Sequence, residues 1–100
     1  MILGVTEQEQ KIIVDILKDY SGKYSFYYYG SRVKGNFSGV SDLDVLIKGE
    51  SEMSLSELVE LKEKFDESRL PYIVNFTDYH NIDERFYNLI KDDLVLVSEN

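Results

Sequence analysis

The chain lacks several features that would place it in a specialised class of protein. Its 100 residues include no cysteine and no tryptophan, one proline and one histidine. Without cysteine it can have neither a disulfide framework nor a thiolate metal site. No run approaches the roughly 20 apolar residues of a membrane span, and the first residues carry no basic region of a secretory signal. We therefore expect a single cytoplasmic domain over residues 1–100, with no membrane partner.

Positive charge is also scarce. The 11 basic side chains face 19 acidic ones, which gives a net charge of −8. Duplex nucleic acid needs Lys and Arg to neutralise its phosphates, so this balance argues against direct nucleic-acid binding. An acidic surface suits a basic protein partner better, although solubility alone explains most of these charges.

Capping patterns and periodic apolar residues divide the chain into alternating helices and strands. Thr6 and Ser54 each stand three residues before a glutamate, as in a capping box, and predict helices that end near residues 21–22 and 68. A similar pattern over residues 81–84 predicts a last helix. Strands are predicted over residues 25–29, 43–47, 72–76 and 94–97. The order favours an α/β (α+β) fold, a small mixed sheet with helices packed mainly on one face.

The most informative stretch begins where the first predicted strand ends. Gly30 would let the backbone turn tightly and approach a ligand without a Cβ in the way. Ser31 is a good N-cap for a short helix through Gly35, whose free N–H groups would face an anion. Arg32 and Lys34 add positive charge beside it. These residues predict a phosphate-binding turn.

Two acids stand near the start of the second predicted strand. Asp42 and Asp44 are two residues apart, so their side chains point the same way from Cα atoms about 6.5 Å apart. Such carboxylates repel each other unless a cation lies between them, and hard oxygen ligands favour Mg²⁺ together with substrate phosphates. Taken alone, Asp42 and Asp44 could be acids of a turn, and Gly30-Ser31 could be a plain helix start. Their combination at this spacing favours a nucleotide site.

Gly30-Ser31, the ten following residues and the Asp42-x-Asp44 pair, with Gly35 also in place, resemble the nucleotidyltransferase (polymerase-β-like) superfamily. The small size resembles its minimal members, the MNT-domain proteins, which pair with a helical HEPN partner, often as the antitoxin of a toxin–antitoxin system. The resemblance implies an ATP-binding transferase in which Asp42 and Asp44 hold Mg²⁺ and AMP passes to a tyrosine of the HEPN partner. The nucleotide-binding residues that it implies are Gly30, Ser31, Arg32, Lys34 and Ser41.

The third predicted strand departs from the family pattern. The superfamily normally supplies a third acid there, and the register after Pro71 places Asn75 at that position. An amide can offer an oxygen to a metal but cannot act as a general base. Asp78 should point to the opposite face as a solvated loop acid, and His80 should lie at the surface. Two functions therefore stay open, an active transferase and a catalytically impaired module that binds nucleotide or its partner and neutralises the partner by contact.

Overall fold

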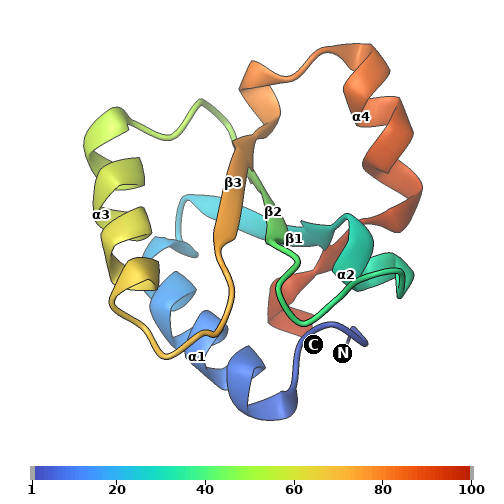
Figure 1. Ribbon diagram of the computed structural model, residues 1–100. Helices are drawn as coiled ribbons and strands as arrows, with labels where there is room; N and C mark the ends of the chain where they lie inside the picture. The colour runs from blue at the N-terminus through green and yellow to red at the C-terminus, as the bar shows by residue number, and fades with distance from the viewer. Residues whose placement is uncertain (1, 100) are drawn as a thin grey trace.

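The computed structural model describes residues 2–99 and is organised around one mixed sheet (Figure 1). Strand β1 runs antiparallel to both β2 and β4, and β2 runs parallel to β3, in the order β3-β2-β1-β4. The parallel pair requires a crossover connection, which helix α3 provides. The strands are β1 (Tyr24–Tyr29), β2 (Leu43–Gly49), β3 (Val74–Asp78) and β4 (Val95–Leu96).

Helices cover both faces of this sheet, two of the three longer ones on the same face. The helices are α1 (Glu7–Leu17), α2 (Ser31–Lys34), α3 (Leu55–Asp66) and α4 (Glu84–Ile90). Phe26 and Tyr28 of β1 pack into the cluster under α1 and α3, whereas Tyr27 and Tyr29 face α4 on the other side. The alternation of side chains along a strand thus explains why consecutive tyrosines serve two cores. The predicted mixed sheet with helices mainly on one face is confirmed.

The helix starts follow the capping patterns, and several boundaries differ from prediction. Both capping boxes are present, with Thr6 and Ser54 as N-caps. Helix α1 ends at Leu17 and continues as a 3₁₀ turn, η1 (Lys18–Tyr20), so it is shorter than predicted. Helix α4 has Asp83 as its N-cap rather than the residue at the start of the 81–84 pattern.

Strand β3 begins two residues later than predicted. Its partner β2 begins at Leu43, which is paired with Val74, so Tyr72 lies outside the sheet and its ring instead stacks on the Arg32 guanidinium at 3.9 Å from ring centroid to Cζ. The first hydrogen bond between the two strands runs from Leu43 N to Ile73 O and is 2.8 Å long. This shift extends β3 to Asp78 and fixes which of its side chains share a face with β2.

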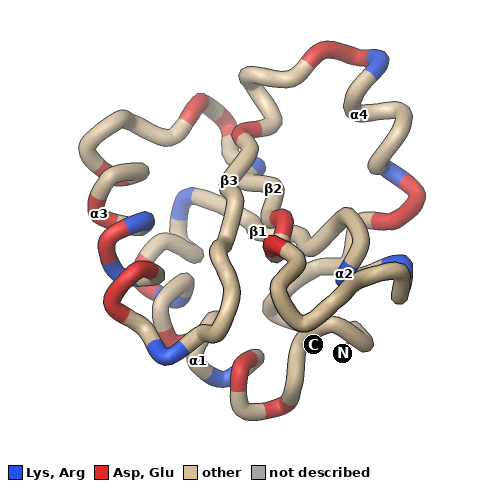
Figure 2. The backbone as a smooth tube through the Cα atoms, viewed as in Figure 1, with Lys and Arg blue, Asp and Glu red and all other residues tan. Residues whose placement is uncertain are grey.

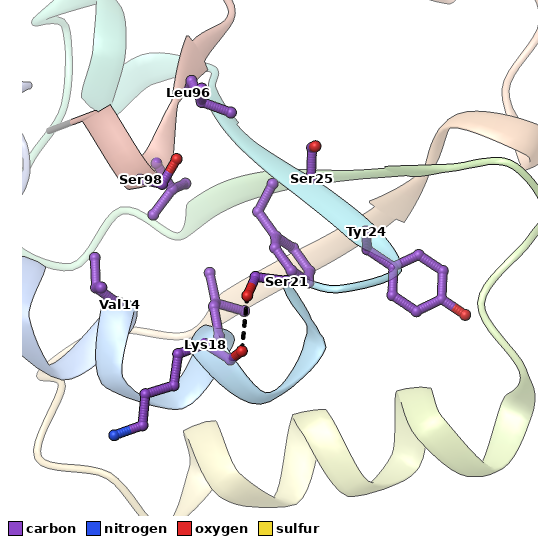
Figure 3. Close-up of a pocket in the computed structure, with 10 residues that line it drawn as sticks. Val14, Lys18, Ser21, Tyr24, Ser25, Leu96 and Ser98 are labelled. Atoms are coloured by element: carbon purple, nitrogen blue, oxygen red, sulfur yellow. Dashed lines mark hydrogen bonds between the residues drawn. The ribbon is translucent and has the colours of Figure 1, made fainter.

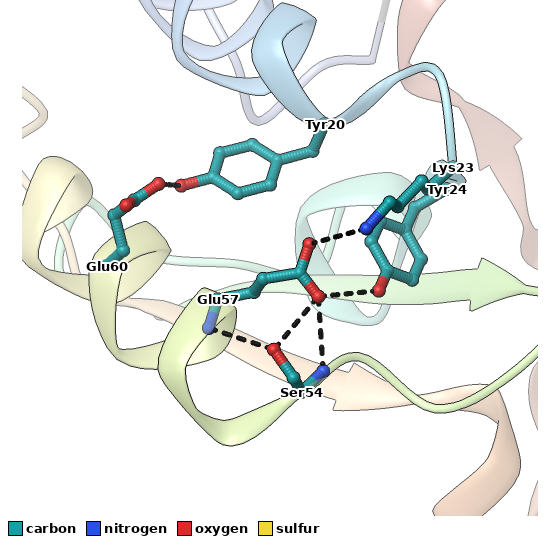
Figure 4. A network of polar contacts seen from close by, with 6 residues as sticks. All are labelled: Tyr20, Lys23, Tyr24, Ser54, Glu57 and Glu60. Carbon is teal, nitrogen blue, oxygen red and sulfur yellow. Dashed lines mark hydrogen bonds and ion pairs between the residues drawn. The ribbon is translucent and has the colours of Figure 1, made fainter.

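Polar side chains connect α1 and α3 to neighbouring parts of the fold. Tyr20 and Tyr24 donate their hydroxyls to Glu60 and Glu57 of α3 (Figure 4). On α1, buried Gln10 accepts from the hydroxyl of Tyr28 and donates to the carbonyl of Val97 at 2.8 Å.

Over residues 2–99, no helix combines the length and the apolar character that crossing a bilayer requires.

Candidate active site

The structure brings the two predicted acids and Asn75 together at one end of the sheet. Asp44 is paired directly with Tyr29 of β1 and with Asn75 of β3. Residues paired across strands point to the same face, here the face that α4 covers. Asp42 lies just before β2, and its Oδ2 accepts a hydrogen bond of 2.9 Å from Asn75 Nδ2. Figure 2 shows two acidic positions close together where β2 begins.

Gly30 lies directly against this acid pair. Its backbone angles, φ 84° and ψ −160°, fall in a region essentially restricted to glycine. A Cβ at this position would stand 2.3 Å from Asp44 Oδ2, closer than any real contact. Glycine is therefore required at this predicted turn for two reasons, the backbone conformation and the close approach of the Asp44 carboxylate.

Ser31 is the first residue of α2, and its predicted role as the N-cap is wrong because Gly30 occupies that position. The cause is the backbone of Gly30, which already turns out of β1, so the helix begins one residue earlier than expected. The hydroxyl of Ser31 forms no hydrogen bond with any residue that the structure describes. It therefore stays available to a ligand beside the acids.

The electrostatics of the acid pair favour a bound cation. Burial raises the pKa of Asp44, the amide of Asn75 partly opposes this, and the negative charge of Asp42 adds to the rise in pKa. Tyr29 is buried beside them, and its hydroxyl shares a hydrogen bond of 2.9 Å with that of Thr77. Burial and the charge of Asp44 also raise the pKa of Tyr29, so this hydroxyl stays protonated. The carboxylates repel each other and would be stabilised by a divalent cation.

The residues present fit one Mg²⁺ ion. Asp42 and Asp44 supply two carboxylates, and Mg²⁺ in nucleotide sites is commonly held by one or two carboxylates together with substrate phosphates. A third acid is missing, since the described residues contain no cluster of three or more Asp, Glu, His or Cys side chains suited to a metal. The amide of Asn75 instead directs an N–H donor at Asp42, where a metal ligand would direct an oxygen.

Asp78 does not replace the missing acid. It points to the opposite face of β3, as predicted, but the expectation of a solvated acid is wrong because Asp78 is buried. Its Oδ2 accepts from the N–H of Met53 at 2.9 Å and its Oδ1 from the N–H of His80 at 3.0 Å. The carboxylate thus caps the 3₁₀ turn η2 (Tyr79–Asn81) and binds the segment that precedes α3. His80 itself is exposed, as expected.

The other residues predicted to bind nucleotide are engaged within the chain. Arg32 is 4% exposed, and its guanidinium donates to backbone carbonyls and forms no ion pair with either acid. Ser41 accepts a hydrogen bond at its Oγ from the N–H of Ser38, 2.9 Å long. Lys34 is exposed and forms an ion pair of 3.6 Å with Asp93.

Sequence reasoning missed Tyr29 and Thr77 as neighbours of the site. Tyr29 was predicted only as part of the strand over residues 25–29, and only the register that sets it opposite Asp44 shows the contact. The one available signal was that Tyr29 directly precedes Gly30.

A separate apolar hollow of about 260 Å³ lies at the other end of β1, beside Tyr24, Phe26 and Leu96, and does not include the acids (Figure 3).

A glycine-serine turn that abuts paired aspartates on a mixed sheet is the arrangement of a nucleotidyltransferase. Residues 10–100 match the family described as polymerase beta, nucleotidyltransferase, and the chain belongs to this family. It is 34% identical over 97 residues to the probable protein adenylyltransferase MntA of Haemophilus influenzae, covering 97% of this chain and 85% of that protein. The sequence-based assignment to this superfamily is thereby confirmed.

Solved structures confirm the fold. One is a crystal structure of a toxin–antitoxin with AMP-PNP, with a TM-score of 0.72 and 20% identity. Another is a mutant of the toxin–antitoxin MntA–HpeT, with a TM-score of 0.70 and 18% identity. Each match covers 88% of this chain and 71% of the other chain.

Proposed function

We propose that this protein is a Mg²⁺-dependent nucleotidyltransferase that moves AMP from ATP to a hydroxyl group of a partner protein. The observation that carries the proposal is the convergence of Asp42, Asp44 and Asn75 beside the Gly30-Ser31 turn. The description of the Haemophilus relative as a protein adenylyltransferase supports AMP as the group transferred. The AMP-PNP of one structural neighbour agrees with ATP as the donor.

In this proposal the chain's own residues bind and orient the triphosphate. Asp42 and Asp44 hold Mg²⁺, which when bound offsets the charge on the phosphates. The hydroxyl of Ser31 and the ammonium of Lys34 bind phosphate oxygens from the side of α2, while Gly30 allows Asp44 to lie against the turn. The acceptor oxygen bonds to the α-phosphorus as the bond to pyrophosphate breaks. Asn75 offers no basic atom for the hydroxyl proton, which passes to solvent.

The acceptor in this proposal belongs to another chain. The sheet and its helices take up nearly all of the described residues, so no separate acceptor-binding domain lies within residues 2–99. We propose a tyrosine of a HEPN-type helical partner as the acceptor, with this protein as the cytoplasmic antitoxin of the pair. The net charge of −8 suits a basic partner.

A second function is favoured by one specific contact. The N–H of Asn75 that donates to Asp42 already offsets part of the negative charge for which a metal would compete. In this alternative the protein binds nucleotide or its partner without turnover and neutralises the partner by contact. Both functions use the same surface and differ in whether a phosphoester bond forms.

Transfer of label from ATP separates the two functions. The protein is incubated with α-³²P-ATP, Mg²⁺ and the protein encoded beside it, and labelled partner is measured. We expect labelled partner with the wild type and with Asp15→Asn, an exposed aspartate on α1, and none with Asp42→Asn. Nucleotide binding without label, followed by label with Asn75→Asp, would establish the binding module. Absence of nucleotide binding by the wild type would refute the transferase, and absence of partner binding as well would refute both functions.

A further inference from the structure

Arg32 stands next to the proposed phosphate-binding turn, yet its side chain turns away from it. We infer that Arg32 is a positioning residue that fixes the loop of residues 36–41 and, through this loop, Asp42. The inference rests on the proposed function in so far as Asp42 holds Mg²⁺. It assigns the arginine a part in the reaction without contact with the nucleotide.

The guanidinium of Arg32 joins two segments that are distant in sequence. Its Nη1 donates to Gly4 O at 2.6 Å, and the N–H of Gly4 donates back to Arg32 O at 3.1 Å. A Cβ on Gly4 would stand 2.3 Å from Arg32 Cβ, so the N-terminal segment lies directly on the stem of this side chain. The other bonds go to the loop, from Nε to Ser41 O at 2.9 Å and from Nη2 to the carbonyls of Ser38 and Gly39 at 3.3 and 3.2 Å.

The charge of Arg32 is stabilised without an acid. Its Cζ lies 3.9 Å from the ring centroid of Tyr72 and 5.1 Å from that of Phe37. Among the described residues, no carboxylate forms an ion pair with it. Carbonyl dipoles and aromatic faces therefore offset the cost of burying this cation. Lysine cannot reproduce the arrangement, since an ammonium has no planar face and a different donor geometry.

The loop depends on Arg32 because it has little other support. It contains no helix or strand, and its internal bonds join only Ser38, Val40 and Ser41. Asp42 follows directly, held on one side by Ser41, whose carbonyl Arg32 binds, and on the other by the pairing of Leu43 with β3. Loss of the guanidinium removes the first of these supports, the hydrogen bond to the Ser41 carbonyl. The carboxylate of Asp42 then keeps only its hydrogen bond from Asn75 Nδ2, while its backbone becomes mobile beside Asp44 and the Gly30-Ser31 turn is retained.

The test compares Arg32→Lys with Lys34→Ala, which removes the neighbouring exposed cation of α2. In hydrogen exchange, we expect the amides of Ser38, Val40 and Ser41, which donate hydrogen bonds within the loop, to exchange about tenfold faster in Arg32→Lys, with those of α3 unchanged. Binding of AMP-PNP in EDTA should be unchanged in this variant. The Mg²⁺ concentration that half-saturates the Mg²⁺-dependent binding should rise about fivefold or more. Lys34→Ala should leave loop exchange at the wild-type rate.

Two results would overturn the inference. One is unchanged exchange in the loop, and the other is an equal loss of AMP-PNP affinity with and without Mg²⁺, as expected if Arg32 touched the nucleotide. If Arg32→Lys does not fold, Tyr72→Leu should speed loop exchange and Tyr72→Phe, which keeps the ring, should not. A wild type that binds AMP-PNP without any Mg²⁺ dependence would refute the proposed function. Loop exchange would then still decide whether Arg32 fixes the loop.

Discussion

Replacement of Gly30 by alanine tests the tightest contact in the site. The backbone at Gly30 lies in a region that costs a non-glycine residue about 1–3 kcal/mol. The added Cβ would also stand 2.3 Å from Asp44 Oδ2, so the carboxylate must move. We therefore expect the free energy of unfolding to fall by about 2–3 kcal/mol, which lowers Tm by roughly 10–20 °C in a domain of this size. The displaced carboxylate should also weaken Mg²⁺-dependent nucleotide binding.

Chemical and thermal unfolding followed by circular dichroism measure this cost. The matched control is Gly22→Ala, because a Cβ there meets nothing within 4 Å, and we expect Tm to stay near that of the wild type. A double-mutant cycle with Asp44→Ala separates the backbone strain at residue 30 from the contact between the added Cβ and the Asp44 carboxylate. The strain does not depend on the Asp44 side chain, so only the contact should give a coupling free energy, of about 1 kcal/mol. The reasoning is refuted if Gly30→Ala unfolds within about 0.5 kcal/mol of the wild type.

Two further substitutions separate function from stability. Asp44→Asn removes a half-buried charge that faces Asp42, and we expect it to raise the free energy of unfolding by about 1 kcal/mol in urea at pH 7 while abolishing Mg²⁺-dependent nucleotide binding. Because the pKa of Asp44 is raised in the folded state, its protonation stabilises the fold as pH falls. The advantage of Asp44→Asn should therefore shrink in acid, and an advantage that grows in acid would contradict this sign. Asp78→Ala leaves the N–H groups of Met53 and His80 without their acceptor, so we expect a loss of about 2–3 kcal/mol. Folded Asp78→Ala should bind AMP-PNP as the wild type does, and weaker binding in calorimetry would place Asp78 in the site.

The parts of the fold that sequence predicts well are those set by local chemistry. The capping boxes at Thr6 and Ser54 formed because each pairs a hydroxyl with a glutamate three residues on, a contact that needs no tertiary structure. The strands around the Gly30 turn were predicted from their apolar and aromatic runs. The spacing of Asp42 and Asp44 likewise depends only on the alternation of side chains along one strand.

Features that depend on long-range contacts were not predictable from the sequence. Arg32 stands beside a glycine turn, and its positive charge suggested a phosphate ligand. Its burial follows from the positions of Tyr72 and Gly4, which only the folded chain brings together. The later start of β3 likewise depends on the register with β2, whose first residue Leu43 is paired with Val74. Gln10 has a polar side chain on a helix, yet Tyr28 and Val97 supply partners that allow it to be buried.

Titration calorimetry with AMP-PNP measures most directly whether Asp42 and Asp44 hold a metal-bound triphosphate against the glycine turn. Wild-type protein is titrated in Mg²⁺ and in EDTA, and the same pair of titrations is repeated with Asp42→Asn. Removing a direct interaction with a charged ligand should cost at least about 1.4 kcal/mol, so we expect the wild type to bind about tenfold or more tightly in Mg²⁺. Asp42→Asn should lose this difference. Equal affinities of the wild type in Mg²⁺ and EDTA, or a Mg²⁺ effect that survives in Asp42→Asn, would contradict the account.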